Sequence, residues 1–209
     1  MNNLNESFMY CKTDIPDSDV EWIISNCRFV GVDTETSGLD PLRDKLNLIQ
    51  IEANGNFYII EYRNDNIPVN IIKLLQCRTL HKVFHHATFD VRFLMKNLQI
   101  YDIPNIICTK IASKLLYGIN SDNSLKNLLS KILGININKD EQLSDWSSTL
   151  SKSQIEYAVN DVKYLVRLWE SLEAKLIEQG LLDTSSSCFS YLPIYALLSN
   201  KGIDNIFQY

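Results

Sequence analysis

The sequence predicts an α/β domain in which helices flank a mixed β-sheet. Three observations predict this class: strand and helix signals alternate over the first half of the chain, an early tight turn joins two strands, and the second half is mostly helical in its periodicity. The tight turn implies an antiparallel pair, so the sheet is not purely parallel. A length of 209 residues with 45% hydrophobic residues suffices for one domain with its own core.

The predicted strands of the first half lie close together in the sequence. Residues 29–32 are a short apolar run that ends at Asp33, which is typical of a buried central strand. A turn-rich stretch then leads to a second strand at 46–51. A third strand at 57–60 follows the turn signal at 54–56, which predicts a hairpin with the strand before it.

The predicted helices begin after this hairpin. A short helix at 69–76 is followed by a short strand at 82–85. Apolar residues at spacings of three and four predict a helix over 88–98, with Thr88 as its N-cap.

From residue 109 onward the pattern is mostly helical. One stripe is capped by Ser124 and is predicted to end at Gly134. A longer stripe predicts one continuous helix over about 153–179.

The predicted organisation is a domain at residues 1–180 and a short C-terminal helical extension at 181–209. The extension is too apolar and aromatic to be a free tail. We expect it either to pack back on its own core or to form a subunit contact.

Composition and charge restrict the class of protein. The five cysteines show no paired spacing, which indicates a reducing compartment. The N-terminus lacks the apolar region of a signal peptide, and no apolar run approaches ~20 residues, so we expect a cytoplasmic protein without a membrane span.

The net charge of −5 is unusual for a protein that binds phosphate groups. Lysines at positions 110, 114, 126 and 131, however, share their stretch with a single acid, Asp122. Two interpretations stay open: a solvated helical face, or a patch that contacts phosphates.

Four carboxylates lie where strands and helices are predicted to begin or end. Asp33 and Glu35 are two residues apart, so an extended backbone points both side chains the same way. Asp90 begins a predicted helix, and Tyr157 and Asp161 share one face of a later helix. Taken singly, each acid has a simpler interpretation as a loop cap, a first-turn acid or a solvent-facing residue.

Together, the four acids supply the oxygen ligands that two Mg²⁺ or Mn²⁺ ions prefer. Two such ions ~3.5–4 Å apart activate a water molecule and stabilise a leaving oxygen in an in-line displacement. The set therefore predicts a two-metal hydrolytic centre.

The order of these residues resembles the three motifs of the DEDD exonuclease superfamily. The motifs are Asp33-x-Glu35, Asp90 at the end of residues 85–90, and Tyr157-x-x-x-Asp161. The tyrosine marks the DEDDy branch, because the sister branch has a histidine where this chain has Glu156. Further stretches resemble ribonuclease D, and the resemblance covers roughly residues 28 to 175; these stretches are Asp33–Leu39, Leu48–Ile51 and Gln142–Ser147.

The resemblance is greatest to the compact nanoRNase C subgroup, through residues 108–115 and 188–193. It implies a ribonuclease H-like (DnaQ-like) exonuclease fold, a 3′→5′ exonuclease activity on short RNA and on DNA, and a ring-shaped homo-oligomer. It also favours a subunit contact for the extension. The stretch 86–88 departs from the bulkier and basic residues of that subgroup.

The resemblance also implies roles for the site residues. The metal ligands would be Asp33, Glu35, Asp90 and Asp161. Tyr157 would orient the attacking water, and the product would be a nucleoside 5′-monophosphate. An ordinary tyrosine titrates near ~10, which favours positioning over action as a free base.

Five further residues are candidates for a place at the site. Thr36 is expected near the terminal 3′-hydroxyl, and Leu39 either wedges against the terminal bases or packs its loop. His85 either contacts substrate or is a structural residue. Trp146 either stacks a base or belongs to the core or to an interface, and Gln50 is a candidate support for Asp33 or for a substrate hydroxyl.

Two alternative functions stay open. The first is a DNA 3′→5′ exonuclease, because discrimination of RNA from DNA depends on 2′-hydroxyl contacts. The second is a catalytically silent nucleic-acid-binding module on the same fold.

Overall fold

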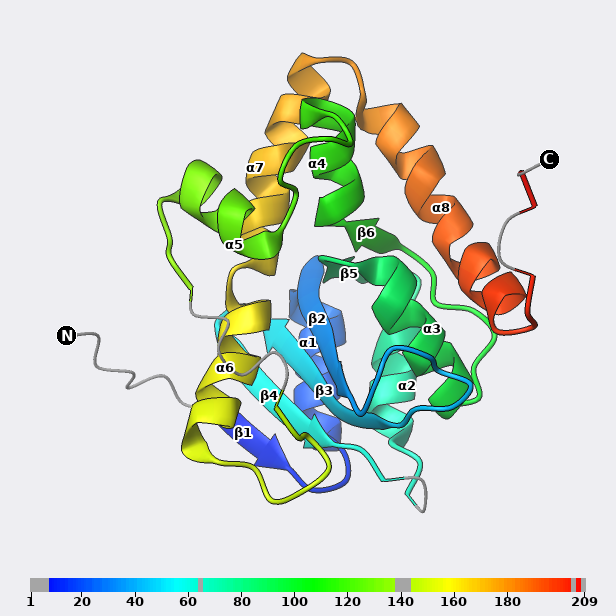
Figure 1. The fold of residues 1–209 in the computed structure, drawn as a ribbon. Coiled ribbons are helices and arrows are strands. Elements are labelled where there is room, and N and C mark those ends of the chain that lie inside the picture. Colours follow the sequence, from blue (N-terminus) through cyan, green and yellow to red (C-terminus); the bar gives the residue numbers. More distant parts are fainter. Residues whose placement is uncertain (1–7, 64–65, 138–143, 204–205, 208–209) are drawn as a thin grey trace.

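The computed structural model describes residues 8–63, 66–137, 144–203 and 206–207, which form one sheet covered by helices (Figure 1). The strands are β1 (Phe8–Cys11), β2 (Phe29–Thr36), β3 (Leu46–Ala53), β4 (Asn56–Glu61), β5 (His81–Phe84) and β6 (Ile106–Cys108). The helices are α1 (Asp17–Asn26), α2 (Val69–Gln76), α3 (Ala87–Asn97), α4 (Thr109–Tyr117), α5 (Leu125–Leu128), the π-helical turn η1 (Leu129–Leu133), α6 (Lys152–Lys163), α7 (Leu165–Glu178) and α8 (Leu182–Ser199).

The predicted mixed sheet is confirmed. Its strand order is β1-β4-β3-β2-β5-β6. Strand β3 runs antiparallel to β2 and to β4, its two neighbours. Strand β1 is parallel to β4, β5 is parallel to β2, and β6 is parallel to β5. The hairpin between β3 and β4 turns at Asn54 and Gly55, whose φ angles of 49° and 83° are those that a two-residue turn of this kind requires. Strands β1 and β6 and helix α1 were not predicted.

The central strands are buried because helices cover them. Helix α6 packs across β2, β3 and β4, and α7 continues over β2 and β5. Helices α1 and α2 pack on each other. The predicted helix 69–76 is confirmed with the same bounds as α2.

The prediction of one continuous helix over 153–179 is wrong. The helix is interrupted at Tyr164, whose φ of −113° and ψ of 1° are not helical. Both parts cover β2, but α6 also covers β3 and β4, whereas α7 also covers β5. Because the sheet is twisted, two helices at an angle follow these strands better than one straight helix would.

Of the two predicted N-caps, Thr88 is wrong and Ser124 is confirmed. Thr88 is not an N-cap: the chain turns after β5, and the Phe89 N–H already bonds to the His86 carbonyl at 2.8 Å, so α3 begins at Ala87. Ser124 does cap its helix by accepting from the Asn127 N–H at 3.3 Å. Gly134 ends the following π-helical turn with a φ of 68°.

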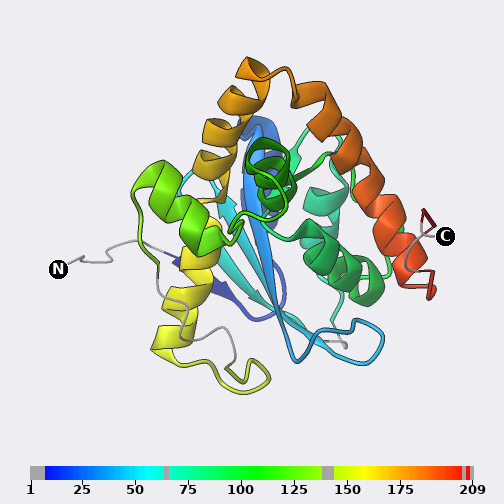
Figure 2. The ribbon, with the colours of Figure 1, turned by 45° about the horizontal axis from the view of Figure 1, so that its top comes forward.

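The C-terminal extension forms α8, which packs back on the same chain. It runs beside α3 (Figure 2) and also contacts β6, α4 and α7. Phe189, Leu192 and Ala196 are buried on its inner face, whereas Ile194 is 52% exposed on the outer face. In the described part of the chain, every helix is too short or too polar to cross a bilayer.

Candidate active site

Strand β2 carries the first two predicted carboxylates to the middle of the sheet. Asp33 is half-buried and Glu35 is 9% exposed. Asp33 lies directly opposite Gln50 in the ladder with β3, so both side chains are on the same face of the sheet.

Helix α6 covers this face and adds the third carboxylate. Asp161 and Tyr157 are both buried and lie one turn apart. The helix approaches β2 closely at Gly31, where a Cβ would lie 2.9 Å from the Val162 carbonyl oxygen. The missing side chain of Gly31 therefore allows the end of α6 to reach the strand.

Three of the four predicted metal ligands come together. Asp33, Glu35 and Asp161 each offer one oxygen, and these oxygens all lie within 4.8 Å of one another. Three carboxylates this close repel each other, and hard oxygen ligands of this kind are what a divalent cation such as Mg²⁺ prefers. The donor set thus fits the metal that the sequence predicted.

The fourth carboxylate, Asp90, lies deeper and is bound by a neighbour. Its side chain is 2% exposed, and it accepts a hydrogen bond of 2.7 Å from the Thr34 hydroxyl. Burial raises the pKa of Asp90, the Thr34 hydrogen bond opposes this rise, and the charge of Asp161 adds to it. Asp90 is therefore close enough to Asp161 to belong to the same electrostatic centre.

Tyr157 lies beside the Asp161 carboxylate. Burial raises its pKa, and the charge of Asp161 and a hydrogen bond to that carboxylate raise it further. The hydroxyl therefore stays protonated and acts as a donor. Its ring packs on Trp146 with centroids 5.8 Å apart. Trp146 is 4% exposed, so its interpretation as a core residue fits the structure and base stacking does not.

The three predicted substrate-contacting residues are spread around this centre. The Thr36 hydroxyl donates to the Gly38 carbonyl at 2.6 Å, which fixes the turn after β2. Leu39 on that turn is 81% exposed. The Thr109 hydroxyl donates to the Phe84 carbonyl at 3.2 Å, so its oxygen accepts from the Nδ1–H of the buried His85 at 2.9 Å.

Several residues of the site escaped the sequence prediction. Thr34 lies between two predicted ligands, yet its hydrogen bond to Asp90 joins positions 56 residues apart, and nothing in the local pattern signals it. The role of Gly31 is likewise visible only in the packing of α6. Gln50 was noted as a candidate; it is fully buried, and its amide has no hydrogen-bond partner among the described residues.

Two of the predicted lysines lie near the second motif. Partial burial, and then the charges of Lys110 and Lys114, lower the pKa of His86 to about 4. His86 immediately precedes the helix that carries Asp90. Lys126 and Lys131 are exposed on α5 and η1. The lysine pair on α4 therefore lies near His86, the residue before the helix that carries Asp90.

The chain is similar to proteins of known class. A family model described as 3′-5′ exonuclease matches residues 15–177. DNA polymerase I of Aquifex aeolicus is 31% identical over 74% of this chain, and ribonuclease D of Acidiphilium cryptum is 28% identical over 74% of it. The matches span only 25% and 40% of those two relatives.

A solved structure matches over the whole length of both chains. Brucella melitensis NrnC bound to pGG is 33% identical, with a TM-score of 0.88 and coverage of 98% of this chain and 100% of that one. The same protein with bound Mg²⁺ has a TM-score of 0.87 at 33% identity, with coverage of 97% and 99%. The chain therefore belongs to the DnaQ-like 3′–5′ exonuclease family of nucleic-acid hydrolases, as a compact, NrnC-like member of its ribonuclease D group.

Proposed function

We propose that this protein is a two-metal-ion 3′→5′ exoribonuclease that releases nucleoside 5′-monophosphates from short RNA. The observation that carries the proposal is the cluster of Asp33, Glu35 and Asp161, whose oxygens lie within 4.8 Å of one another beside the Tyr157 hydroxyl. A relative matched over its full length is bound to pGG, and another relative is a ribonuclease D, which supports short RNA as the substrate.

The three clustered carboxylates and Asp90 would hold two Mg²⁺ or Mn²⁺ ions. Such ions, when bound, polarise the phosphoryl group and lower the pKa of an attacking water. The hydrogen bond from Thr34 would hold the buried Asp90 carboxylate in one orientation. The pKa of Asp90 is raised by burial, and a nearby cation would favour its charged form.

Tyr157 would orient the attacking water. It stays neutral because its pKa is raised, so it does not act as a free base. Its ring is held by Trp146 and its hydroxyl by Asp161, which leaves little freedom for the oxygen. A fixed hydroxyl of this kind lowers the entropy cost of placing water in line with the phosphate.

The turn after β2 would position the end of the RNA. Thr36 fixes this turn through Gly38, and we assign it a place near the terminal 3′-hydroxyl. Leu39 is exposed at 81%, and an apolar side chain so placed is suited to wedge against the terminal bases. His85, held through Nδ1 by Thr109, would contact the substrate near the second motif, where its Nε2 could accept from a sugar hydroxyl.

The test is digestion of 5′-labelled RNA from two to about twenty nucleotides with Mn²⁺ or with EDTA. We expect stepwise shortening from the 3′ end, loss of activity in EDTA and in Asp33→Asn, and fastest cleavage of dinucleotides. A matched Asp122→Asn variant, on an exposed loop, should retain activity. Intact RNA ends with both metals would contradict the proposal.

A DNA exonuclease is the second candidate, because a DNA polymerase I is 31% identical to this chain over 157 residues. Matched DNA oligonucleotides in the same assay distinguish the two. A rate on DNA well above that on RNA would replace short RNA as the proposed substrate.

We also propose a cytoplasmic homo-oligomer, in the form of a ring. Support comes from apolar side chains near the C-terminus that remain solvent-exposed in the single chain: Ile194, Ile203 and Phe207 are 52%, 46% and 69% exposed. Light scattering that gives only a 24.1 kDa species would contradict this assembly.

A further inference from the structure

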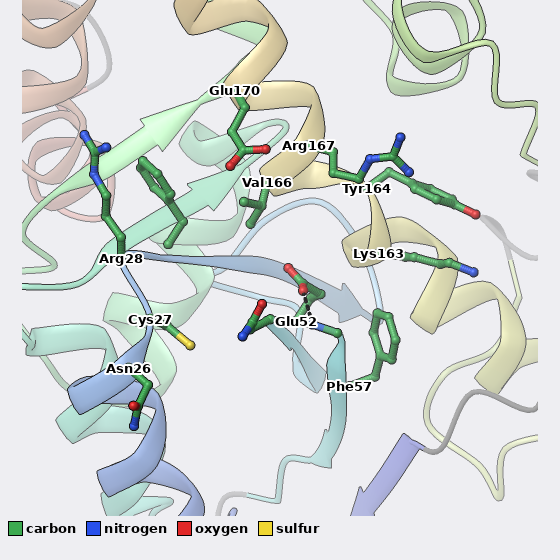
Figure 3. A pocket seen from close by; sticks show the side chains of 13 residues that line it. Asn26, Cys27, Arg28, Glu52, Phe57, Lys163, Tyr164, Val166, Arg167 and Glu170 are labelled. Atoms are coloured by element: carbon green, nitrogen blue, oxygen red, sulfur yellow. Dashed lines mark hydrogen bonds between the residues drawn. The ribbon is translucent and has the colours of Figure 1, made fainter.

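A pocket lies at the opposite end of β2 from the acidic centre formed by Asp33, Glu35 and Asp161. It is formed by the start of β2, the β3–β4 turn and the junction of α6 with α7, and its volume is about 540 Å³ (Figure 3). Phe29 in its wall is four residues before Asp33, or about 13 Å along an extended strand. The pocket is therefore separate from the nuclease centre, and its volume suits a small organic ligand.

The inner part of this pocket contains a buried carboxylate, that of Glu52. Glu52 is 7% exposed; one of its oxygens accepts from the Gly55 N–H at 2.8 Å, and the other is buried with no partner among the described residues. Burial raises the pKa of Glu52, and the charge of Glu170 on α7 raises it further. Figure 3 shows the carboxylates of the buried Glu52 and the exposed Glu170 directed toward the middle of the pocket. A buried carboxylate oxygen without a hydrogen-bond donor raises the free energy of the folded protein. N–H groups of a ligand would supply the missing hydrogen bond.

The outer part of the pocket is cationic. Lys163 and Arg167 line it on one side and extend away from the two carboxylates, whereas Arg28 lines the opposite side (Figure 3). The lining has three cationic and two acidic side chains, so its net charge is positive. Guanidinium and ammonium groups at a pocket mouth are suited to a phosphate group.

Flat apolar surface connects the two ends. Phe57 and Tyr164 also line the pocket, and the Lys163 ammonium lies 5.1 Å from the centroid of the Tyr164 ring. Aromatic faces of this kind stack on nucleobases with little regard to sequence.

We propose that this pocket binds a guanine mononucleotide, with the base edge at Glu52 and the phosphate at Lys163 and Arg167. Guanine carries two adjacent donor groups, N1–H and the N2 amino group, on the edge that a carboxylate can accept from. Adenine has only its amino group there and places an acceptor beside it. An organic polycation would satisfy the carboxylates, but it would be repelled by the outer cations.

The experiment is calorimetric titration of the full chain with GMP, AMP, guanosine and spermidine. EDTA and an Asp161→Asn background remove metal-dependent binding at the nuclease centre, so the result does not depend on the exonuclease activity. We expect GMP to bind at least tenfold more tightly than AMP. Glu52→Gln should weaken GMP at least tenfold, because a charge-assisted hydrogen bond is lost.

Arg167→Glu provides a second variant on an exposed helix position, where folding is not at risk. It should weaken GMP at least tenfold and change guanosine affinity by less than about twofold, because only the phosphate contact is lost. The proposal is overturned if GMP does not saturate the protein, if AMP binds equally well, if spermidine is preferred, or if neither variant changes GMP affinity.

Discussion

Substitution of Gly31 by alanine tests how strongly catalysis depends on the contact between β2 and α6. A Cβ at this position would lie 2.9 Å from the Val162 carbonyl oxygen, whereas ordinary contacts begin at 3.4 Å. The difference requires the end of α6 to retreat by about 0.5 Å. Val162 follows Asp161 directly, so the retreat moves a proposed metal ligand.

The expected magnitudes follow from this displacement. Misplacement of reacting groups by 1 Å costs ~10²-fold in rate, so half of that distance should lower kcat about tenfold. Overpacking costs ~1–3 kcal/mol, and the smaller conformational freedom of alanine in the unfolded chain recovers ~0.4–1 kcal/mol, so the middle of both ranges leaves a loss of about 1.3 kcal/mol. For a chain of this size the Tm should fall by about 3–5 °C.

The assay is single-turnover digestion of a short RNA, at a temperature well below the Tm of the wild type and of Gly31→Ala. Thermal unfolding of both proteins is measured alongside. Ile23→Val is the matched control, because Ile23 is fully buried on α1, which packs on α2 rather than on α6. It should lose ~0.5–1.5 kcal/mol without loss of kcat. An unchanged kcat in Gly31→Ala, at a lowered Tm, would refute the link between this contact and catalysis.

Four further predictions concern single interactions. Tyr157→Phe keeps the ring contact with Trp146 but removes the hydroxyl that donates to Asp161, so kcat should fall about 10²-fold and the Tm should fall as well; an unchanged rate would exclude water orientation by this residue. Mg²⁺ should raise the Tm of the wild type by relieving carboxylate repulsion, and EDTA or Asp161→Asn should abolish the shift; a shift that persists in the variant places the ion elsewhere. Thr34→Val leaves the buried Asp90 without its donor and should cost ~1–3 kcal/mol of stability as well as activity, whereas Thr34→Ser should retain both; indistinguishable variants would mean that the hydrogen bond is unimportant. Burial lowers the pKa of Lys82 to about 8 from 10.5, so the folded chain binds fewer protons than the unfolded chain between these values; the stability of the wild type relative to Lys82→Met should therefore rise with pH across that window, and a flat difference in unfolding free energy would contradict the shift.

The sequence predicted the parts of the fold that have a strong local signal. The β3–β4 hairpin was predicted because Asn54-Gly55 requires positive φ angles that few other residue pairs adopt. Helix α2 was predicted with its bounds because its apolar stripe is regular. Strand β1 escaped because it is a short edge strand that depends on β4, far away in the sequence. The break at Tyr164 escaped because apolar spacing continues through it, while the curvature of the sheet decides where the helix bends.

The candidate site also contains residues that the sequence predicted and residues that it did not. Asp33, Glu35 and Asp161 could be predicted because residue type and spacing are themselves the signal, and the structure brings them within 4.8 Å. The support of Asp90 by Thr34 could not be predicted, because it depends on how α3 packs against β2.

The distribution of charge resolves the apparent conflict between a net charge of −5 and a phosphate substrate. Three of the acids gather at one centre and the fourth, Asp90, lies deeper; two divalent ions would carry four positive charges to the same place, so the acids would cancel locally instead of repelling RNA. Lys110 and Lys114 lie close enough to His86, beside that centre, to perturb its pKa, and they would leave the substrate side positive. The overall charge therefore says little about phosphate binding in this chain, because the four positive charges of two bound ions would bring the net charge from −5 to about −1. It follows that removal of the metal should do more than abolish catalysis: it should convert the site into one that repels RNA, and binding of RNA should weaken together with its cleavage.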